Sequence, residues 1–92
     1  MSFIKKYIKE KCDADPEFRA EYEAEALRLK LVRAREAAGL TQRELAERLG
    51  VSQPRIAQVE RGSRPMSAAF LLRYAAAVHM KLDVSPRHPA SS

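Results

Sequence analysis

The sequence predicts a mainly α-helical domain, with five helices and one short C-terminal β-strand. Three observations lead to this fold class. The only three glycines among the 92 residues, Gly39, Gly50 and Gly62, each follow a helix-like run, at the place where a helix cap favours glycine. Hydroxyl or acidic residues stand where the helices would begin. Aromatic residues make up 7% of the chain and tryptophan is absent, so we expect one domain with a small aliphatic core.

The first helix is expected within residues 2–12. Apolar residues recur there at helical spacing, with lysines on the other face. These apolar residues are Phe3, Ile4, Tyr7 and Ile8. A segment of this kind can bind a membrane surface, but its apolar stripe is short. We therefore expect it to pack on the domain or on a partner, and we expect no membrane partner.

The second helix is expected from Glu17 to Ala38. Asp15 can cap it, and Pro16 fits the first helical position. Acidic residues are concentrated early in this segment and basic residues late, which suits the dipole of a helix. Gly39 is placed to end it.

Two short helices are expected next. Thr41 begins the first, with Glu44 at the capping-box spacing, and Gly50 ends it. Ser52 begins the second, which ends at Gly62. Two short helices joined by a tight turn form a helix-turn-helix candidate. In that motif the second helix enters the major groove of DNA.

A fifth helix and a short strand complete the prediction. The helix runs from about Ser67 to Val78 and carries one apolar stripe. Residues 80–84 alternate between apolar and polar, as strands do. The chain is thus divided into a helical leader, a DNA-binding domain, and a strand with a frayed tail. These parts span residues 1–26, 27–78 and 79–92.

Charge is distributed in three blocks. The net charge is +5, with +3 in residues 1–12, −5 in residues 13–26 and +7 in residues 27–92. A basic protein favours a polyanionic partner, nucleic acid first and a membrane surface second. The acidic block has the charge to face a basic protein.

Other function classes are disfavoured. One cysteine and two separated histidines form no metal-ligand pattern, so we expect no metal and no other cofactor. No grouping of nucleophile, base or paired carboxylates indicates an enzyme. The single cysteine suits a reducing cytoplasm, and no segment resembles a signal peptide or a membrane span. We therefore expect a cytoplasmic protein without enzymatic activity.

The segment "GLTQRELAERLGVSQPRIAQVERG" resembles the helix-turn-helix of the XRE, or phage-repressor (Cro), type. The resemblance spans about residues 31 to 78 and implies a five-helix, phage-repressor-like domain. In this family the residue that matches Gln53 reads a base, usually adenine, through its side-chain amide. The residue that matches Gln42 binds a phosphate and supports the reading glutamine. Pro54 departs from the usual polar residue and leaves only apolar contact at that position.

The resemblance gives three sets of candidate residues, any of which would otherwise be ordinary solvated surface. The base-reading candidates are Gln53, Pro54, Arg55 and Gln58. The DNA phosphate candidates are Thr41, Gln42, Arg43, Arg61, Ser63 and Arg64. The family pattern also implies a buried structural ion pair between Arg35 and Glu60.

The flanking segments "DPEFRAEYEAEALRLKLVRAREAAGLTQ" and "LLRYAAAVHMKLDV" are similar to HigA-type antitoxins, over about residues 15 to 84. This resemblance implies the antitoxin of a type II toxin–antitoxin module. Such a protein neutralises a small basic RNase toxin, an mRNA endonuclease, and represses its own operon. The toxin-binding candidates are Phe3, Ile4, Tyr7, Ile8, Phe18 and Tyr22.

DNA recognition by such domains requires a dimer with half-sites one helical turn apart. Two elements can supply the contact across the two-fold axis, the helix of residues 67–78 or the strand of residues 80–84 pairing with its copy. The dimer candidates on them are Tyr74, Met80, Leu82 and Val84. Two alternatives to the antitoxin stay open. One is a stand-alone XRE-type transcriptional repressor, and the other is a protein-binding module that has lost DNA affinity.

Overall fold

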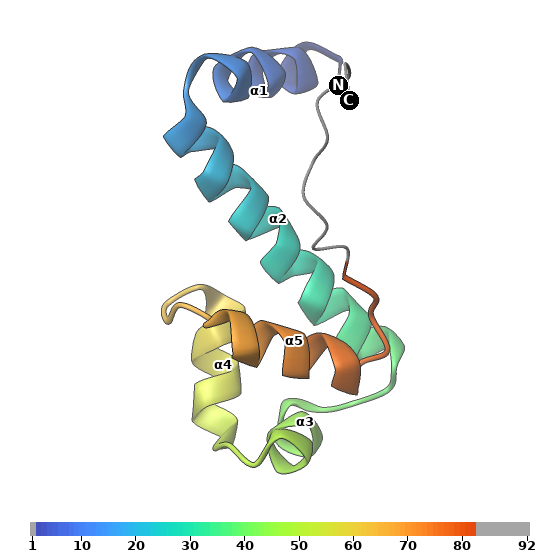
Figure 1. Ribbon diagram of the computed structural model, residues 1–92. Helices are drawn as coiled ribbons and strands as arrows, with labels where there is room; N and C mark the ends of the chain where they lie inside the picture. The colour runs from blue at the N-terminus through green and yellow to red at the C-terminus, as the bar shows by residue number, and fades with distance from the viewer. Residues whose placement is uncertain (1, 83–92) are drawn as a thin grey trace, which may run out of the picture.

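The computed structural model describes residues 2–82, most of which lie in five α-helices. The helices are α1 (Ser2–Ala14), α2 (Pro16–Ala37), α3 (Gln42–Leu49), α4 (Gln53–Arg61) and α5 (Ala68–Ala77). In Figure 1, α3, α4 and α5 gather at the C-terminal end of α2, while α1 lies across the other end of α2. The five predicted helices are confirmed, and each is present within about two residues of its expected bounds.

The core lies where α2, α3, α4 and α5 meet. Each of these helices contributes at least one side chain that is almost completely buried. The most deeply buried large side chains are Leu31, Leu45, Ile56, Val59 and Tyr74. Because α4 supplies two of them, the inner face of α4 is fixed by close packing, and its opposite face is left for other contacts.

The arm, defined here as α1 with residues 16–26 of α2, extends from this core. Only Asp15 separates the two helices, and its carboxylate accepts hydrogen bonds from the amides of Glu17 (3.0 Å) and Phe18 (3.2 Å). This is the predicted cap, with Pro16 in the first turn. Helix α1 packs on α2, with Ile8 half-buried. Within the arm, none of residues 3–14 and 16–26 is fully buried.

The predicted capping box is present at the start of α3. The Thr41 hydroxyl accepts from the Glu44 amide, and the Glu44 carboxylate accepts from the Thr41 amide, both at 3.0 Å. At the other end, Gly50 closes the helix with a φ of 69°. Such a left-handed conformation costs glycine little. The helix-turn-helix segment is therefore bounded by local interactions that its own sequence encodes.

Replacing Thr41 by alanine is expected to lower the free energy of unfolding by about 1 kcal/mol. The substitution removes the acceptor for the Glu44 amide at an exposed position and leaves the core untouched. Urea denaturation followed by circular dichroism measures the change. Thr41→Ser, which keeps the hydroxyl, should stay within about 0.5 kcal/mol of the parent. Equal losses in both variants would mean that the cap is not the cause.

The predicted C-terminal strand is wrong for the residues that the structure describes. Met80, Lys81 and Leu82 are not in a strand. The side chains of Met80 and Leu82 instead pack half-buried against the core of their own chain. A strand also needs a backbone partner, and none of the described elements offers one. Val84 lies outside the described residues.

Candidate nucleic-acid interface

A tight turn joins α3 to α4 and leaves the start of α4 open to solvent. The turn consists of Gly50, Val51 and Ser52, and the Ser52 hydroxyl accepts from the Arg55 amide at 3.3 Å. On α4, Ile56 and Val59 point into the core with 0% and 2% exposure. The first residues of α4, Gln53 and Pro54, are exposed. A proline is tolerated here because first-turn amides have no partner within the helix.

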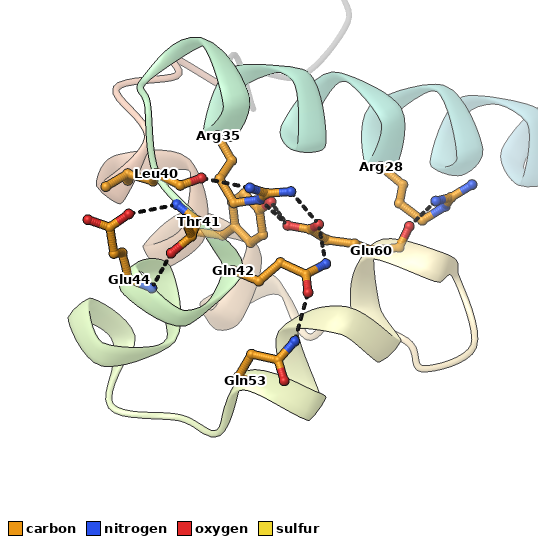
Figure 2. A network of polar contacts seen from close by, with 9 residues as sticks. Arg28, Arg35, Leu40, Thr41, Gln42, Glu44, Gln53 and Glu60 are labelled. Atoms are coloured by element: carbon orange, nitrogen blue, oxygen red, sulfur yellow. Dashed lines mark hydrogen bonds and ion pairs between the residues drawn. The ribbon is translucent and has the colours of Figure 1, made fainter.

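A chain of hydrogen bonds orients the side chain of Gln53. The Gln53 amide nitrogen donates to the side-chain oxygen of Gln42 at 2.8 Å. The Gln42 amide nitrogen donates to a carboxylate oxygen of Glu60 at 3.0 Å. Figure 2 shows this series running from α2, through Glu60 and Gln42, to Gln53 on the open side of α4. Gln53 keeps one N–H and its carbonyl oxygen for other partners.

The chain of hydrogen bonds ends on a buried ion pair, at the two positions that the family resemblance implied. The Nε and Nη2 atoms of Arg35 donate to the two carboxylate oxygens of Glu60, at 2.7 and 3.0 Å. Arg35 also donates to the Leu40 carbonyl at 2.6 Å, and the Tyr74 hydroxyl donates to Glu60. Arg35 and Glu60 are only 9% and 8% exposed. A buried pair is retained at low cost only when its remaining hydrogen-bonding atoms are satisfied in this way.

The pair shifts the proton affinities of its members. Burial alone raises the pKa of Glu60, but the hydrogen bonds from Arg35, Tyr74 and Gln42 and the charge of Arg35 outweigh it. The net pKa of Glu60 lies below its usual value. Burial and the hydrogen bond to Glu60 raise the pKa of Tyr74. At neutral pH the network therefore consists of an ionised Arg35–Glu60 pair with a neutral tyrosine.

Two of the four base-reading candidates occupy less open positions than expected. The Arg55 guanidinium lies over the ring of Phe70, 4.6 Å from its centroid, and its buried Nε atom has no hydrogen-bond partner among the described residues. The side chain thus packs toward α5, where a cation–π contact holds it. Gln58 is half-buried. Gln53 and Pro54 form the exposed part of the predicted reading surface.

The phosphate candidates lie on α3 and α4 and at their ends. All except Gln42 are exposed. Ser63 is further fixed by donating its hydroxyl hydrogen to the Gln58 carbonyl at 3.1 Å. The exposed members are Thr41 and Arg43 at the start of α3, and Arg61, Ser63 and Arg64 at the end of α4 and beyond. In the sequence, two of these residues therefore precede α4 and three stand at or after its end.

Of the dimer candidates that lie among the described residues, none is fully exposed. Tyr74 has 0% exposure and is committed to Glu60, so it offers nothing to a second copy. The apolar stripe of α5 was identified correctly, but the hydroxyl of Tyr74 was needed by a buried carboxylate, a requirement that the local sequence does not reveal. Met80 and Leu82 are half-buried in their own chain.

The candidates for binding a protein partner lie on the arm. Three of them are strongly exposed: Phe3 at 84%, Tyr7 at 59% and Ile4 at 52%. Tyr22 is 44% exposed and stacks on the half-buried Phe18, with 6.3 Å between ring centroids. Ile8 is half-buried between the two helices. Two of the candidates, Ile8 and Phe18, are thus half-buried. The other four are open to solvent: Phe3, Ile4, Tyr7 and Tyr22.

The sequence profile of the helix-turn-helix family matches residues 31–85 of this chain. The chain belongs to the helix-turn-helix family. The matched region covers residues 31–37 at the end of α2 and all of α3, α4 and α5, which is the part that carries the Gln53–Gln42–Glu60–Arg35 series. It is a domain of the XRE type.

Its relatives are named as regulators. Two proteins of Mycobacterium tuberculosis, each named an uncharacterized HTH-type transcriptional regulator, are 48% identical to it over 50 residues, covering 54% of this chain and 36% of theirs. A protein of Sinorhizobium fredii with the same kind of name is 35% identical over 66 residues, covering 72% of this chain and 34% of its own. The chain thus spans about a third of the length of these relatives. No solved structure gives a significant match.

In this helix-turn-helix protein two arginines of the site were missed by sequence reasoning. Arg28 donates to the main-chain carbonyl of Glu60 at the end of α4. Arg73 donates to the carbonyl of Leu49 at the end of α3. Both satisfy helix-end carbonyls from a different helix. Arg28 had one usable signal, because it stands seven residues before Arg35 and therefore on the same face of α2.

None of the helices within residues 2–82 combines the length and the apolar character that crossing a membrane would require.

Proposed function

We propose that the chain is a transcriptional regulator that binds operator DNA by placing the start of α4 in the major groove. The observation that carries the proposal is the exposed Gln53 side chain, oriented by Gln42 and, through it, by the buried Glu60. A side-chain amide held in this way is suited to adenine, because its oxygen can accept from N6 while its nitrogen donates to N7. Orientation before binding lowers the entropic cost of forming such a contact.

The charges around α4 support the same function. Arg43, Arg61 and Arg64 are exposed, and residues 27–92 carry a net charge of +7. Contacts from such residues to phosphates position a protein on the duplex but do not select a sequence. We propose that two copies bind together, on half-sites about 34 Å apart. Each copy would read one half-site with its own α4.

The test is an in vitro selection of bound duplexes from a random pool, followed by fluorescence anisotropy with the full chain. A selected duplex should be bound about 10³-fold or more tightly than a scrambled duplex of equal composition. Affinity should fall steeply with salt, because phosphate neutralisation releases counterions. Equal affinity for both duplexes would contradict sequence-specific regulation.

A second proposed function is that of an antitoxin, supported by the arm. The exposed residues Phe3, Ile4 and Tyr7 lie on α1, away from the helix-turn-helix, in a chain whose core is complete without them. Aromatic side chains of this kind act as anchors in protein interfaces. The net charge of −5 over residues 13–26 favours a basic partner. We propose that the arm binds a small basic RNase toxin encoded by the adjacent gene. The DNA-bound form of the protein would repress the operon that the two genes share.

Removing the outer aromatic residues with Phe3→Ala/Tyr7→Ala is expected to weaken binding of the adjacent gene product by about 30-fold or more, the effect of one strong interface anchor. Affinity is measured by calorimetry, with rescue of growth on co-expression as a second readout. The control is Leu72→Ala, which removes a side chain of similar exposure (50%) from α5. Failure of the wild-type chain to bind that product or to rescue growth would leave the stand-alone regulator as the function.

A further inference from the structure

Two arginines on α2 hold the same residue of the proposed recognition helix. Arg28 and Arg35 are seven residues apart, two turns along one face of α2, with the buried Leu31 between them. Arg35 binds the side-chain carboxylate of Glu60, and Arg28 donates to the main-chain carbonyl of Glu60. Figure 2 shows both arginines reaching Glu60 from α2. The last turn of α4 is thereby tied to α2 at two points.

The guanidinium of Arg28 is closely confined. Its side chain is 17% exposed, although its partner Glu25 is 57% exposed. The Nε atom donates to Glu25 at 3.2 Å, and a second guanidinium nitrogen pairs with the other Glu25 oxygen. A Cβ atom on Gly62 would lie only 3.1 Å from the Arg28 Nε atom. The glycine that ends α4 therefore also leaves room for the arginine that caps it, in addition to supplying a φ of 78°.

The contact between Arg28 and the Glu60 carbonyl lies at the last turn of α4, and it can affect where the first turn of α4 lies. Gln53 and Glu60 are seven residues apart, which is about 10 Å along a helix axis. A small tilt of α4 at Glu60 therefore displaces Gln53 relative to a base edge. Hydrogen bonds to bases tolerate little displacement, whereas long arginine side chains can still reach phosphates. Loss of the Arg28 contact should therefore affect sequence recognition more than general attraction to DNA.

We propose that Arg28 is a positioning residue for DNA recognition: it sets the orientation of α4 on α2 without touching DNA itself. This inference rests on the proposed function of α4. The inference also gives α2 two roles: its first residues belong to the arm, and Arg28 on the same helix orients the recognition helix. The contribution of Arg28 to overall stability is expected to be small, because its ionic partner is a solvent-exposed carboxylate.

The experiment measures the affinity of full-length variants for the selected duplex and for its scrambled counterpart over a range of salt concentrations. Arg28→Ala should weaken binding to the selected duplex by about tenfold, within the range of one well-formed base contact. Its affinity for the scrambled duplex and its salt slope should not change. Arg28→Lys, which can still donate to the Glu60 carbonyl, should recover most of the loss. Arg19→Ala is the matched control, because Arg19 lies on the same helix and pairs with Glu23 at 3.1 Å.

The outcomes separate this inference from the function on which it rests. Equal weakening on both duplexes with a smaller salt slope would make Arg28 a phosphate contact and overturn the proposal. An unchanged preference for the selected duplex would also overturn it. If Arg28→Ala fails to fold, Glu25→Gln replaces it, because this variant loosens the guanidinium at an exposed site and should reduce the same preference. A wild-type chain that does not distinguish the two duplexes would contradict the proposed function itself, and the role of Arg28 would fall with it.

Discussion

Replacing Glu60 by alanine is expected to lower the free energy of unfolding by about 3–5 kcal/mol, the largest effect on stability that we predict. The carboxylate accepts hydrogen bonds from Arg35, Gln42 and Tyr74. Its removal therefore leaves a buried cation, a buried hydroxyl and a half-buried amide without their partner. Small domains are stable by only about 5–15 kcal/mol. For a chain of this size, a loss of 3–5 kcal/mol corresponds to a fall in Tm of at least about 12 °C. Thermal and urea unfolding followed by circular dichroism measure both quantities.

The same residue should contribute to unfolding in acid. The pKa of Glu60 is lower in the folded chain than its usual value, which is about 4.3 in an unfolded chain. The stability that Glu60 provides is therefore fully present above that value and is lost as pH falls through the lower, folded-state pKa. We expect the free energy of unfolding of the parent to fall below about pH 4 and to change less steeply with pH in Glu60→Gln, which has no proton to gain.

The controls separate the buried network from the loss of an acidic residue in general. Glu47→Ala removes an exposed carboxylate from α3 and should change stability by less than about 0.5 kcal/mol. Glu60→Gln should be destabilising as well, because a neutral amide leaves the charge of Arg35 uncompensated. A Glu60→Ala protein as stable as the parent would show that the ion pair contributes nothing net to folding.

The parts of the fold that the sequence predicts well depend on local chemistry. The capping box at Thr41 and the left-handed glycine at Gly50 involve residues within a few positions of one another. Such interactions are set by neighbouring residues, so helix ends could be placed without knowing the tertiary structure. The pairing of Arg35 with Glu60 spans 25 residues and was expected only from family resemblance.

The misjudged residues depend on contacts that no local pattern encodes. Arg55 has the spacing of an outward residue near the start of α4, yet the ring of Phe70 on α5 holds its guanidinium. Tyr74 lies on the expected apolar stripe, but its hydroxyl satisfies a carboxylate from another helix. Met80 and Leu82 have the alternation of a strand, which is also the spacing of two side chains that pack on a core. In each case a residue from elsewhere in the fold decides the outcome.

Replacing Gln53 by alanine is expected to give the largest loss of DNA affinity, about 1–3 kcal/mol on the selected duplex. A bidentate contact to adenine needs both the oxygen and one N–H of the amide, and both are available on Gln53 after it has bonded to Gln42. Stability should change by less than about 0.5 kcal/mol, because the side chain is exposed. Affinity for scrambled DNA should be unchanged. Fluorescence anisotropy at fixed salt measures all variants on both duplexes.

Two further variants test whether the effect comes from base reading. Arg61→Ala should weaken binding to both duplexes alike and lower the salt slope by about 1, because a phosphate contact carries no sequence information. Gln42→Ala should produce part of the Gln53→Ala loss, since it removes the group that orients the reading amide. Because the two glutamines act in series, the double variant should lose less than the sum of the single losses. Strict additivity would mean that Gln42 and Gln53 meet the DNA independently, and that the hydrogen bond between them has no part in recognition.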